Sequence, residues 1–376
     1  MAIRSTYPEK FPEMKTSARF LEIDVLRAIA CVMVLAGHTA EEISKLAFSH
    51  SSAKVAHDFI WQTGIGNSAV VIFFAISGFG ICSSMRGPRY SGSMDFIIRR
   101  FFRLYPVFWL SMLIAILFYW LPQGLPFDWR KIIANSTMLP QLFGEGGLIV
   151  VYWTLETELA FYFLCLFLFL IRVHNHPLAL TTTILLLFVV FCYFLSHRSI
   201  APKYLPWFGM PYHICIAFWG ALYRYCLENG TSHFTLFSLR IQYWKIFYVV
   251  TGMILLPALY AFATYLSNGN YWLLRNSFPY ISGVIGFFIF TRYLPIRSTI
   301  LAEAGNYTYS IYLIHHVTIT FTIFCLKDSH PEFFGFPIYI YFLYFFLLNL
   351  MIGYLVYNKI EKPMMNFSKQ LIKRIK

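Results

Sequence analysis

The sequence predicts an all-α fold: a polytopic membrane helical bundle of about ten transmembrane helices with both termini cytoplasmic. Three observations lead to this class. Hydrophobic residues make up 58% of the 376-residue chain and charged residues only 12%, roughly half the charged fraction of an ordinary soluble domain. The mean hydropathy is +0.60. Apolar runs of membrane length recur from one end of the chain to the other.

Ten apolar stretches are long enough to cross a bilayer. They are residues 21–41, 64–85, 101–121, 152–171, 179–196, 207–225, 245–265, 277–293, 306–326 and 338–358. The first follows a polar, basic segment and shows no cleavage-site pattern, so we interpret it as a retained helix. We therefore divide the chain into a cytoplasmic segment (1–20), a transmembrane domain (21–358) and a basic cytoplasmic tail (359–376).

The net charge of +13 does not indicate nucleic-acid binding, because the surplus Lys and Arg residues stand in short loops. There they orient helices and contact anionic membrane lipid. With the N-terminus inside, most of them fall on the cytoplasmic side, which supports two cytoplasmic termini. The seven cysteines lie in or at the ends of apolar runs without CxxC spacing, so they predict neither disulfides nor a metal site.

Residues 122–151 do not fit this alternation of spans and short loops. Their apolar piece, 132–143, contains Pro140, is followed by several glycines and is too short to cross a membrane. We favour an outer loop or interfacial segment, and the alternative is a half-helix or re-entrant segment that lines a cavity. No internal repeat of the kind that marks many secondary transporters is visible.

The first span contains Arg27 and His38, eleven residues apart in an apolar run. At 100° per residue their directions differ by about 20°, so they share one helix face about 16 Å apart. Asp24 lies near that face. Because charged groups in lipid are costly, the pair indicates a functional site. The alternative is that Arg27 only pairs with Asp24 and that His38 is a packing residue.

The second and third spans add small and cationic residues. Ser77 and its neighbouring glycines in VVIFFAISGFG let another helix or a thin ligand approach the backbone. Arg99, Arg100 and Arg103 cluster where the third span begins, and the last two lie one turn apart. Planar guanidinium groups suit phosphate. The alternative is a positive-inside anchor that binds lipid headgroups.

Two later spans carry further polar groups. In WTLETELAFY, which begins at Trp153, Glu156 and Glu158 differ by about 200° around the helix, so only one can face a given cavity. Glu158 is the deeper of the two, and it is suited to pair with Arg27, orient His38 or accept a proton; a structural ion pair is the alternative. In the ninth span, Tyr309, Tyr312 and His316 form one stripe along the helix, and His315 lies beside it. The stripe is compatible with a catalytic role, and the alternative is a set of polar contacts that hold the helix bundle together.

Taken in order, these segments resemble the membrane-bound acyltransferase-3 family of bacterial O-acyltransferases, which includes O-antigen acetyltransferases. The matching pieces are an Arg and a His separated by ten residues, FFAISGF, RRFFRLYP, WTLETELAFY, YTYSIYLIHH and IEKP. The resemblance covers nearly the whole chain and implies ten helices with both termini cytoplasmic. It implies that Arg27 and His38 are required for activity, that Arg100 and Arg103 form the RxxR motif, and that Glu158 is the WxLxxE acid.

The resemblance implies an O-acyltransferase that moves an acyl group, most commonly acetyl, from cytoplasmic acyl-CoA to a hydroxyl of an envelope glycan or lipid-linked saccharide. We expect a location in the bacterial cytoplasmic (inner) membrane, acyl-CoA as a donor substrate and no tightly bound cofactor. His38 is the expected base, with Arg27 and Glu158 in the catalytic group. Donor contacts are expected from Arg99, Arg100, Arg103 and Ser77, and other substrate contacts from Asp24, Trp153, Tyr309 and His315.

Two other classes remain open from the sequence alone. A transporter or flippase for an acyl group or a lipid-linked saccharide would use the same charged path, although the ordered motifs and the lack of visible repeats count against it. A membrane sensor or scaffold would leave Arg27 and His38 without a purpose. Direct attack by the acceptor hydroxyl is simpler than an acyl-enzyme, because no Ser or Cys is clearly paired with a base; an acyl-His38 remains the alternative.

Overall fold

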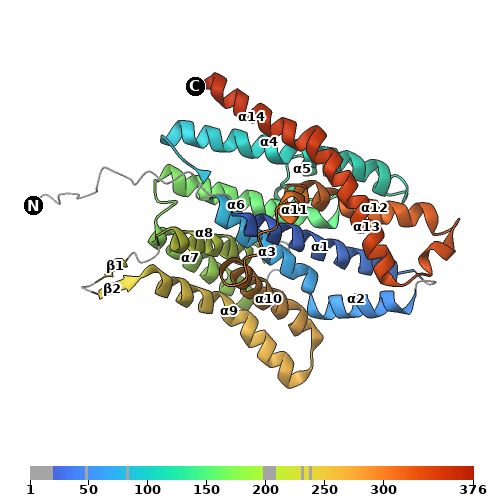
Figure 1. Ribbon diagram of the computed structural model, residues 1–376, viewed down its shortest axis with the longest axis horizontal. Coiled ribbons are helices and arrows are strands. Elements are labelled where there is room, and N and C mark those ends of the chain that lie inside the picture. Colours follow the sequence, from blue (N-terminus) through green and yellow to red (C-terminus); the bar gives the residue numbers. More distant parts are fainter. Residues whose placement is uncertain (1–19, 47–49, 82–83, 198–208, 230–232, 237–238) are drawn as a thin grey trace, which may run out of the picture.

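The structure is a computed structural model that describes residues 20–46, 50–81, 84–197, 209–229, 233–236 and 239–376. The expected cytoplasmic segment 1–20 lies almost wholly outside the described residues. Helices dominate the described part, and one short two-stranded hairpin is the exception (Figure 1). The all-α helical bundle predicted from the sequence is therefore confirmed.

The described residues of the first half form six α-helices, one short π-helical segment (η2) and two short 3₁₀ helices (η3 and η4). They are α1 (Leu21–Ser44), α2 (Ser51–Thr63), α3 (Ile65–Ile81), α4 (Arg89–Ala115), η2 (Ile116–Trp120), α5 (Trp129–Ser136), η3 (Pro140–Phe143), η4 (Val150–Tyr152) and α6 (Trp153–Leu170). The second half contains α7 (Pro177–Ser196), α8 (Met210–Asn229), β1 (His233–Leu236), β2 (Leu239–Gln242), α9 (Tyr243–Asn268), α10 (Tyr271–Arg292), α11 (Thr299–Ala304), α12 (Thr308–Leu326), η6 (Pro331–Phe334), α13 (Ile338–Val356), η7 (Tyr357–Glu361) and α14 (Lys362–Ile375).

Each of the ten predicted spans coincides with a helix. Within the described residues, eight helices are long and apolar enough to cross a membrane, and the bent pair of α2 and α3, which meet at 50°, raises the number to nine. The remaining range corresponds to α8, a 20-residue helix that is buried along most of its length. The predicted ranges 64–85 and 207–225 extend a few residues beyond what the structure describes.

The centre of the bundle is α3, which packs against α1, α8 and α10. Glycine makes its contact with α8 very close. A Cβ added at Gly78 would lie 1.5 Å from the Ala217 carbonyl oxygen, and one added at Gly220 would lie 2.1 Å from the Ala75 carbonyl oxygen. The two backbones can approach this closely only because both positions lack a side chain.

Aromatic contacts fix the directions of the central helices. Phe79, near the end of α3, packs on Phe20 at 5.1 Å between ring centroids, just before α1 begins. It also contacts Tyr223 of α8 and Phe287 of α10, both late in their helices. We call this level, where α1 begins, the proximal end of the bundle. Consequently α3, α8 and α10 all begin at the opposite, distal end.

The segment 122–151 folds back along α4. Helix α5 ends beside the middle of α4, where Tyr105 and Trp109 donate hydrogen bonds to the carbonyl oxygens of Thr137 and Ser136 at 2.9 and 3.0 Å. Tyr105 is about 22 Å from the distal end of the α4–η2 helix at Trp120, taking 1.5 Å per residue. The segment thus packs along α4 for part of that helix's length, and the two interpretations from the sequence, an outer loop or interfacial segment and a re-entrant segment, both stay open. The apolar run was too short to reveal this, because the return path is set by contacts with α4.

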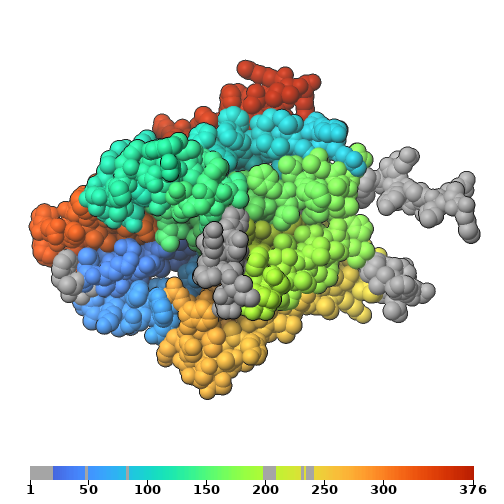
Figure 2. All heavy atoms as spheres, turned by 180° about the vertical axis from the view of Figure 1, so that it is seen from behind, coloured from blue at the N-terminus to red at the C-terminus, as the bar shows by residue number. Residues whose placement is uncertain are grey.

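Two peripheral elements complete the molecule. The hairpin of α9 and α10 projects from the body (Figure 2) and exposes apolar side chains such as Leu256, Leu259 and Leu266, as a lipid-facing surface does. The tail is helical, because α13 continues through η7 into α14 without a break at residue 359. Helix α14 lies against α4, where Lys376 pairs with Asp95 at 2.7 Å.

Candidate active site

A cavity of about 220 Å³ lies between α1, α3, α4, α6 and α12 and extends from the proximal end to the middle of the bundle. Its polar lining consists of Arg27, Ser77, Arg100, Arg103, Thr154, Glu158, Tyr162, Thr308, Tyr309 and Tyr312. Residues from five separate sequence segments thus meet in one place. Five of the residues singled out in the sequence for catalysis or donor binding are among them.

The cavity is rich in positive charge. Arg27 pairs with Asp24 at 2.9 Å, one turn earlier on α1, and still lines the cavity. The sequence analysis offered the Arg27–Asp24 ion pair as an alternative to a functional site. In the structure Arg27 makes this ion pair and also lines the cavity. Arg100 donates to the Ser84 hydroxyl at 3.2 Å and lies over the ring of Tyr162. Arg103 completes a set of three guanidinium groups around one space, an arrangement suited to an anion.

Arg99 lies outside this cavity. Its side chain is 46% exposed and is 3.8 Å from Asp95 on the surface of α4. The sequence grouped Arg99 with Arg100 and Arg103. Its direction differs by about 100° from that of Arg100 but by only about 40° from that of Arg103, so helix spacing alone does not exclude it from the cavity. The expected pairing of Arg100 with Arg103 on one face agrees with the structure, whereas the donor contact expected from Arg99 finds no support there.

Glu158 is the carboxylate of the cavity. It accepts a short hydrogen bond from the Tyr162 hydroxyl and a longer one, at 3.4 Å, from Ser77. Glu156, two residues earlier, is 1% exposed and does not line the cavity. The helical spacing correctly indicated that only one of the two acids faces it. Glu158 lies among cationic side chains and partly balances their charge. Its hydrogen bond with Ser77 also links α6 to α3.

The small residues of α3 serve two purposes on opposite sides of that helix. Gly78 faces α8 and allows the close packing described above. Ser77 and Gly80 face the cavity, and a Cβ added at Gly80 would meet nothing within 4 Å. The sequence offered helix packing and ligand access as alternatives. In the structure Gly78 allows the packing, and Ser77 and Gly80 line the cavity.

Helix α12 closes the cavity toward the distal end. The Tyr309 hydroxyl donates to the Leu104 carbonyl oxygen at 2.9 Å and ties α12 to α4. The Tyr312 hydroxyl is 2.7 Å from the Thr154 hydroxyl and 3.2 Å from the Val151 carbonyl oxygen, so it ties α12 to α6. Tyr312 is thus the last group that the cavity presents before the histidines.

A cluster of three histidines lies directly beyond Tyr312. The rings of Tyr312 and His315 are 5.8 Å apart, and those of His315 and His38 are 5.2 Å apart. His316 lies 5.5 Å from His38 on the other side. His38 therefore sits one aromatic ring past the end of the cavity. Among the described residues, no group of three His, Cys, Asp or Glu side chains is arranged to hold a metal ion.

His315 has a defined tautomer when neutral. Its Nδ1 lies 2.7 Å from the Tyr312 carbonyl oxygen, which can only accept, so this nitrogen carries the proton. Its Nε2 is then a buried acceptor, and no protein hydrogen bond satisfies it within the described residues. This lone pair is available to a donor group that enters the cluster.

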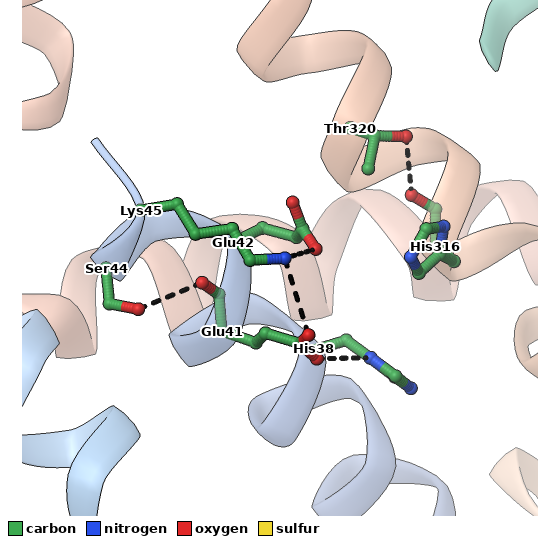
Figure 3. A network of polar contacts seen from close by, with 7 residues as sticks. All are labelled: His38, Glu41, Glu42, Ser44, Lys45, His316 and Thr320. Atoms are coloured by element: carbon green, nitrogen blue, oxygen red, sulfur yellow. Dashed lines mark hydrogen bonds and ion pairs between the residues drawn. The ribbon is translucent and has the colours of Figure 1, made fainter. Parts of the chain in front are cut away.

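The sequence reasoning missed Glu41. Its carboxylate is 3.3 Å from His38 Nδ1 and 3.4 Å from Lys45 Nζ, as Figure 3 shows. An acid three residues after a histidine on the same helix was the available signal. An acid this close to one ring nitrogen is a feature expected for the partner of a general base.

Trp153 and Asp24 lie apart from the cavity lining. Asp24 forms an ion pair with Arg27, which does line the cavity. Trp153 opens α6 on the side away from the cavity and packs on His213, with ring centroids 5.2 Å apart. Of the residues expected to make further substrate contacts, only Tyr309 lines the cavity, and His315 belongs to the histidine cluster.

Comparison with known proteins agrees with this geometry. A family model described as an acyltransferase domain, Acyl_transf_3, matches residues 20–372. The chain belongs to the acyltransferase-3 family. It is thus a multi-pass membrane acyltransferase that acts on groups other than aminoacyl groups. Comparison with curated proteins and with solved structures gives no match.

Proposed function

We propose that this acyltransferase transfers an acyl group, most simply acetyl, from cytoplasmic acyl-CoA to a hydroxyl of an envelope glycan or lipid-linked saccharide on the outer side of the bacterial inner membrane. The observation that carries the proposal is a single cavity that has three guanidinium groups toward the proximal end and ends one ring from His38. Transfer from a polyanionic thioester donor needs cationic residues that position the donor and a base that accepts the proton of the attacking hydroxyl.

The donor is proposed to enter at the proximal end, on the cytoplasmic side. The CoA phosphates would contact Arg100 and Arg103, whose planar guanidinium groups match phosphate oxygens. The pantetheine arm would follow α1 past Arg27, and the separation of about 16 Å between Arg27 and His38 is of the order of an extended arm. The thioester would then reach Tyr312 and the histidine cluster.

His38 is proposed to act as the general base. It takes the proton from the acceptor hydroxyl while that oxygen attacks the thioester carbonyl carbon. The C–O bond forms, the C–S bond breaks, and the thiolate takes up the proton to leave as CoA. Glu41, 3.3 Å from His38 Nδ1, favours the protonated imidazole during this step. No acyl-enzyme is needed.

The proposal is tested by mass spectrometry of envelope polysaccharides from cells with and without the protein. We expect a mass difference equal to one acyl group per modified residue, and the mass identifies the group. Identical spectra, with the protein present in the membrane, would contradict the function. A His38→Ala chain separates the transporter alternative, because acylation that persists in this variant favours transport over catalysis.

The donor part of the proposal predicts that Arg100→Ala and Arg103→Ala each weaken CoA binding by roughly ten- to a hundredfold, since one charge-assisted contact is worth about 1.5–3 kcal/mol. Titration of CoA onto the purified protein measures this. Arg99→Ala is the matched control, because Arg99 lies next to Arg100 in sequence but outside the cavity. Equal affinity in all three variants and the parent would leave these arginines as topology anchors only.

A further inference from the structure

We propose that a second cavity, at the distal end of the bundle, binds a sugar ring of the acceptor. This inference rests on the proposed function and specifies the acceptor side of the same reaction. The cavity has a volume of about 110 Å³ and is lined by Asn67, Val70, Val71, Trp153, His213, Arg275, Asn276, Pro279 and Tyr280. These residues come from the N-terminal halves of α3, α6, α8 and α10.

The chemistry of the lining suits a saccharide. Trp153 offers a flat apolar face of the kind that packs against the C–H groups of a pyranose ring, and 38% of its surface is exposed. Asn67 and Asn276 each provide amide donors and acceptors that match sugar hydroxyls. An aromatic wall with a few convergent polar groups is the usual composition of a small-molecule site.

Two further residues are held in place by neighbouring side chains. His213 is 9% exposed, lies 3.3 Å from the Tyr280 hydroxyl and packs on Trp153. Arg275 stacks on the Trp61 ring at 4.6 Å and donates to the Trp61 carbonyl oxygen at 3.4 Å, so its guanidinium is fixed at the rim. These contacts hold both side chains in fixed positions at the wall of the cavity.

The second cavity adjoins the larger cavity between α1, α3, α4, α6 and α12, which we call the donor cavity because the acyl donor is proposed to bind there. Val70 lines both of them. Phe74 lines the donor cavity on one side, and its ring packs on His213 at 5.1 Å on the other. Trp153 and Thr154, consecutive on α6, line different cavities. A few side chains of α3 and α6 are therefore all that separates the two spaces.

The second cavity is also at the level of His38. A Cβ added at Gly37, the residue before His38, would lie 3.9 Å from the Gly66 Cα, and Gly66 precedes Asn67 of the cavity. A sugar held here would lie at the depth of the base, whereas a donor would reach the base from the proximal end.

The test uses the full-length protein purified in a detergent without a sugar headgroup. Saturation-transfer difference NMR is recorded with free glucose, galactose, rhamnose and N-acetylglucosamine, and CoA is titrated onto the same samples. We expect a signal from at least one sugar. Asn276→Ala and Trp153→Ala should reduce it roughly three- to tenfold, as the loss of one or two ordinary contacts would, without changing CoA affinity.

Asn358→Ala is the matched control. Asn358 donates to the carbonyl oxygen four residues earlier in its helix, as Asn276 does, but it lies in η7, far from the cavity in the chain and outside its lining. Absence of any sugar signal, or equal signals in the parent, Asn276→Ala and Trp153→Ala, would overturn the inference. Failure of the parent to bind CoA would instead count against the proposed function, whatever the sugar signals show.

Discussion

At the scale of single residues, His38 and Glu41 form the part of the site where chemistry is expected. We predict that His38→Ala lowers the turnover by about 10²–10⁴-fold, the usual contribution of a general base. Expression and membrane insertion should not change, because alanine is a good helix former and His38 contributes no backbone contact that alanine lacks. Acyl transfer by the purified protein and its thermal unfolding temperature measure the two effects.

His57→Ala provides the control for this variant. His57 lies on α2 and pairs with Asp58 at 3.4 Å, outside both cavities. This variant should keep the parent turnover. If His38→Ala transfers acyl groups at the parent rate, His38 is not the base and the mechanism proposed above is wrong.

Arg27 tests whether the site needs a planar guanidinium or only a charge. We predict that both Arg27→Lys and Arg27→Gln lose most activity, because Arg27 holds Asp24 at 2.9 Å while facing the cavity, and an ammonium group lacks the forked donors that allow both contacts. Turnover of the two variants is measured side by side. An active Lys variant beside an inactive Gln variant would show that Arg27 acts as a point charge.

At the scale of helices, α3 has two roles: it packs against a neighbouring helix and it lines the larger cavity. One side packs against α8 through Gly78, and the other lines the proposed donor cavity through Ser77 and Gly80. The cavity thus has a wall whose position is fixed by a backbone-to-backbone contact. Such a contact has little freedom to adjust, because there is no side chain between the helices to repack.

This arrangement predicts opposite results for two similar substitutions. Gly78→Ala places a methyl group 1.5 Å from the Ala217 carbonyl oxygen, so α3 and α8 must separate, and we expect a loss of at least about 1–3 kcal/mol of stability, the usual cost of overpacking. Gly80→Ala meets open space and should fold normally. Thermal unfolding in detergent measures both. Equal unfolding temperatures for the two variants would contradict the described α3–α8 packing.

At the scale of the whole molecule, the sequence is a good guide to the spans and a partial guide to the site. Lipid requires long apolar helices with internally satisfied backbones, so hydropathy locates most of them. Helical spacing also placed Arg100 beside Arg103 and distinguished Glu158 from Glu156. These inferences succeed because each depends only on the geometry of one helix.

The features that the sequence did not predict depend on contacts between helices. The return of 122–151 along α4 is set by Tyr105 and Trp109, which the sequence shows only as aromatic residues of a span. The separation of Trp153 from Glu158 into different cavities depends on where α3 and α8 pack against α6. The closeness of His315 to His38 depends on the pairing of α1 with α12.

The whole bundle makes one prediction about direction. Arg100 and Arg103 lie toward the proximal end with the start of α1, whereas His38 and the second cavity lie toward the distal end, so donor and acceptor should be used from opposite sides of a membrane. In vesicles that contain the protein in one orientation, transfer should occur when acetyl-CoA is on the N-terminal side and acceptor is on the other. CoA is too highly charged to cross lipid, so it should give no product when supplied from the acceptor side alone.

A tag on the N-terminus that is open to protease on one side only identifies the orientation of the protein. Labelled acetyl-CoA then reports transfer for each placement of the two substrates, and Arg103→Ala vesicles give the background. Product that forms only when donor and acceptor share one side would contradict a path through the bundle. In that case the donor cavity and the distal cavity could not be the two ends of one reaction, and the arginines would have to bind an anion other than CoA.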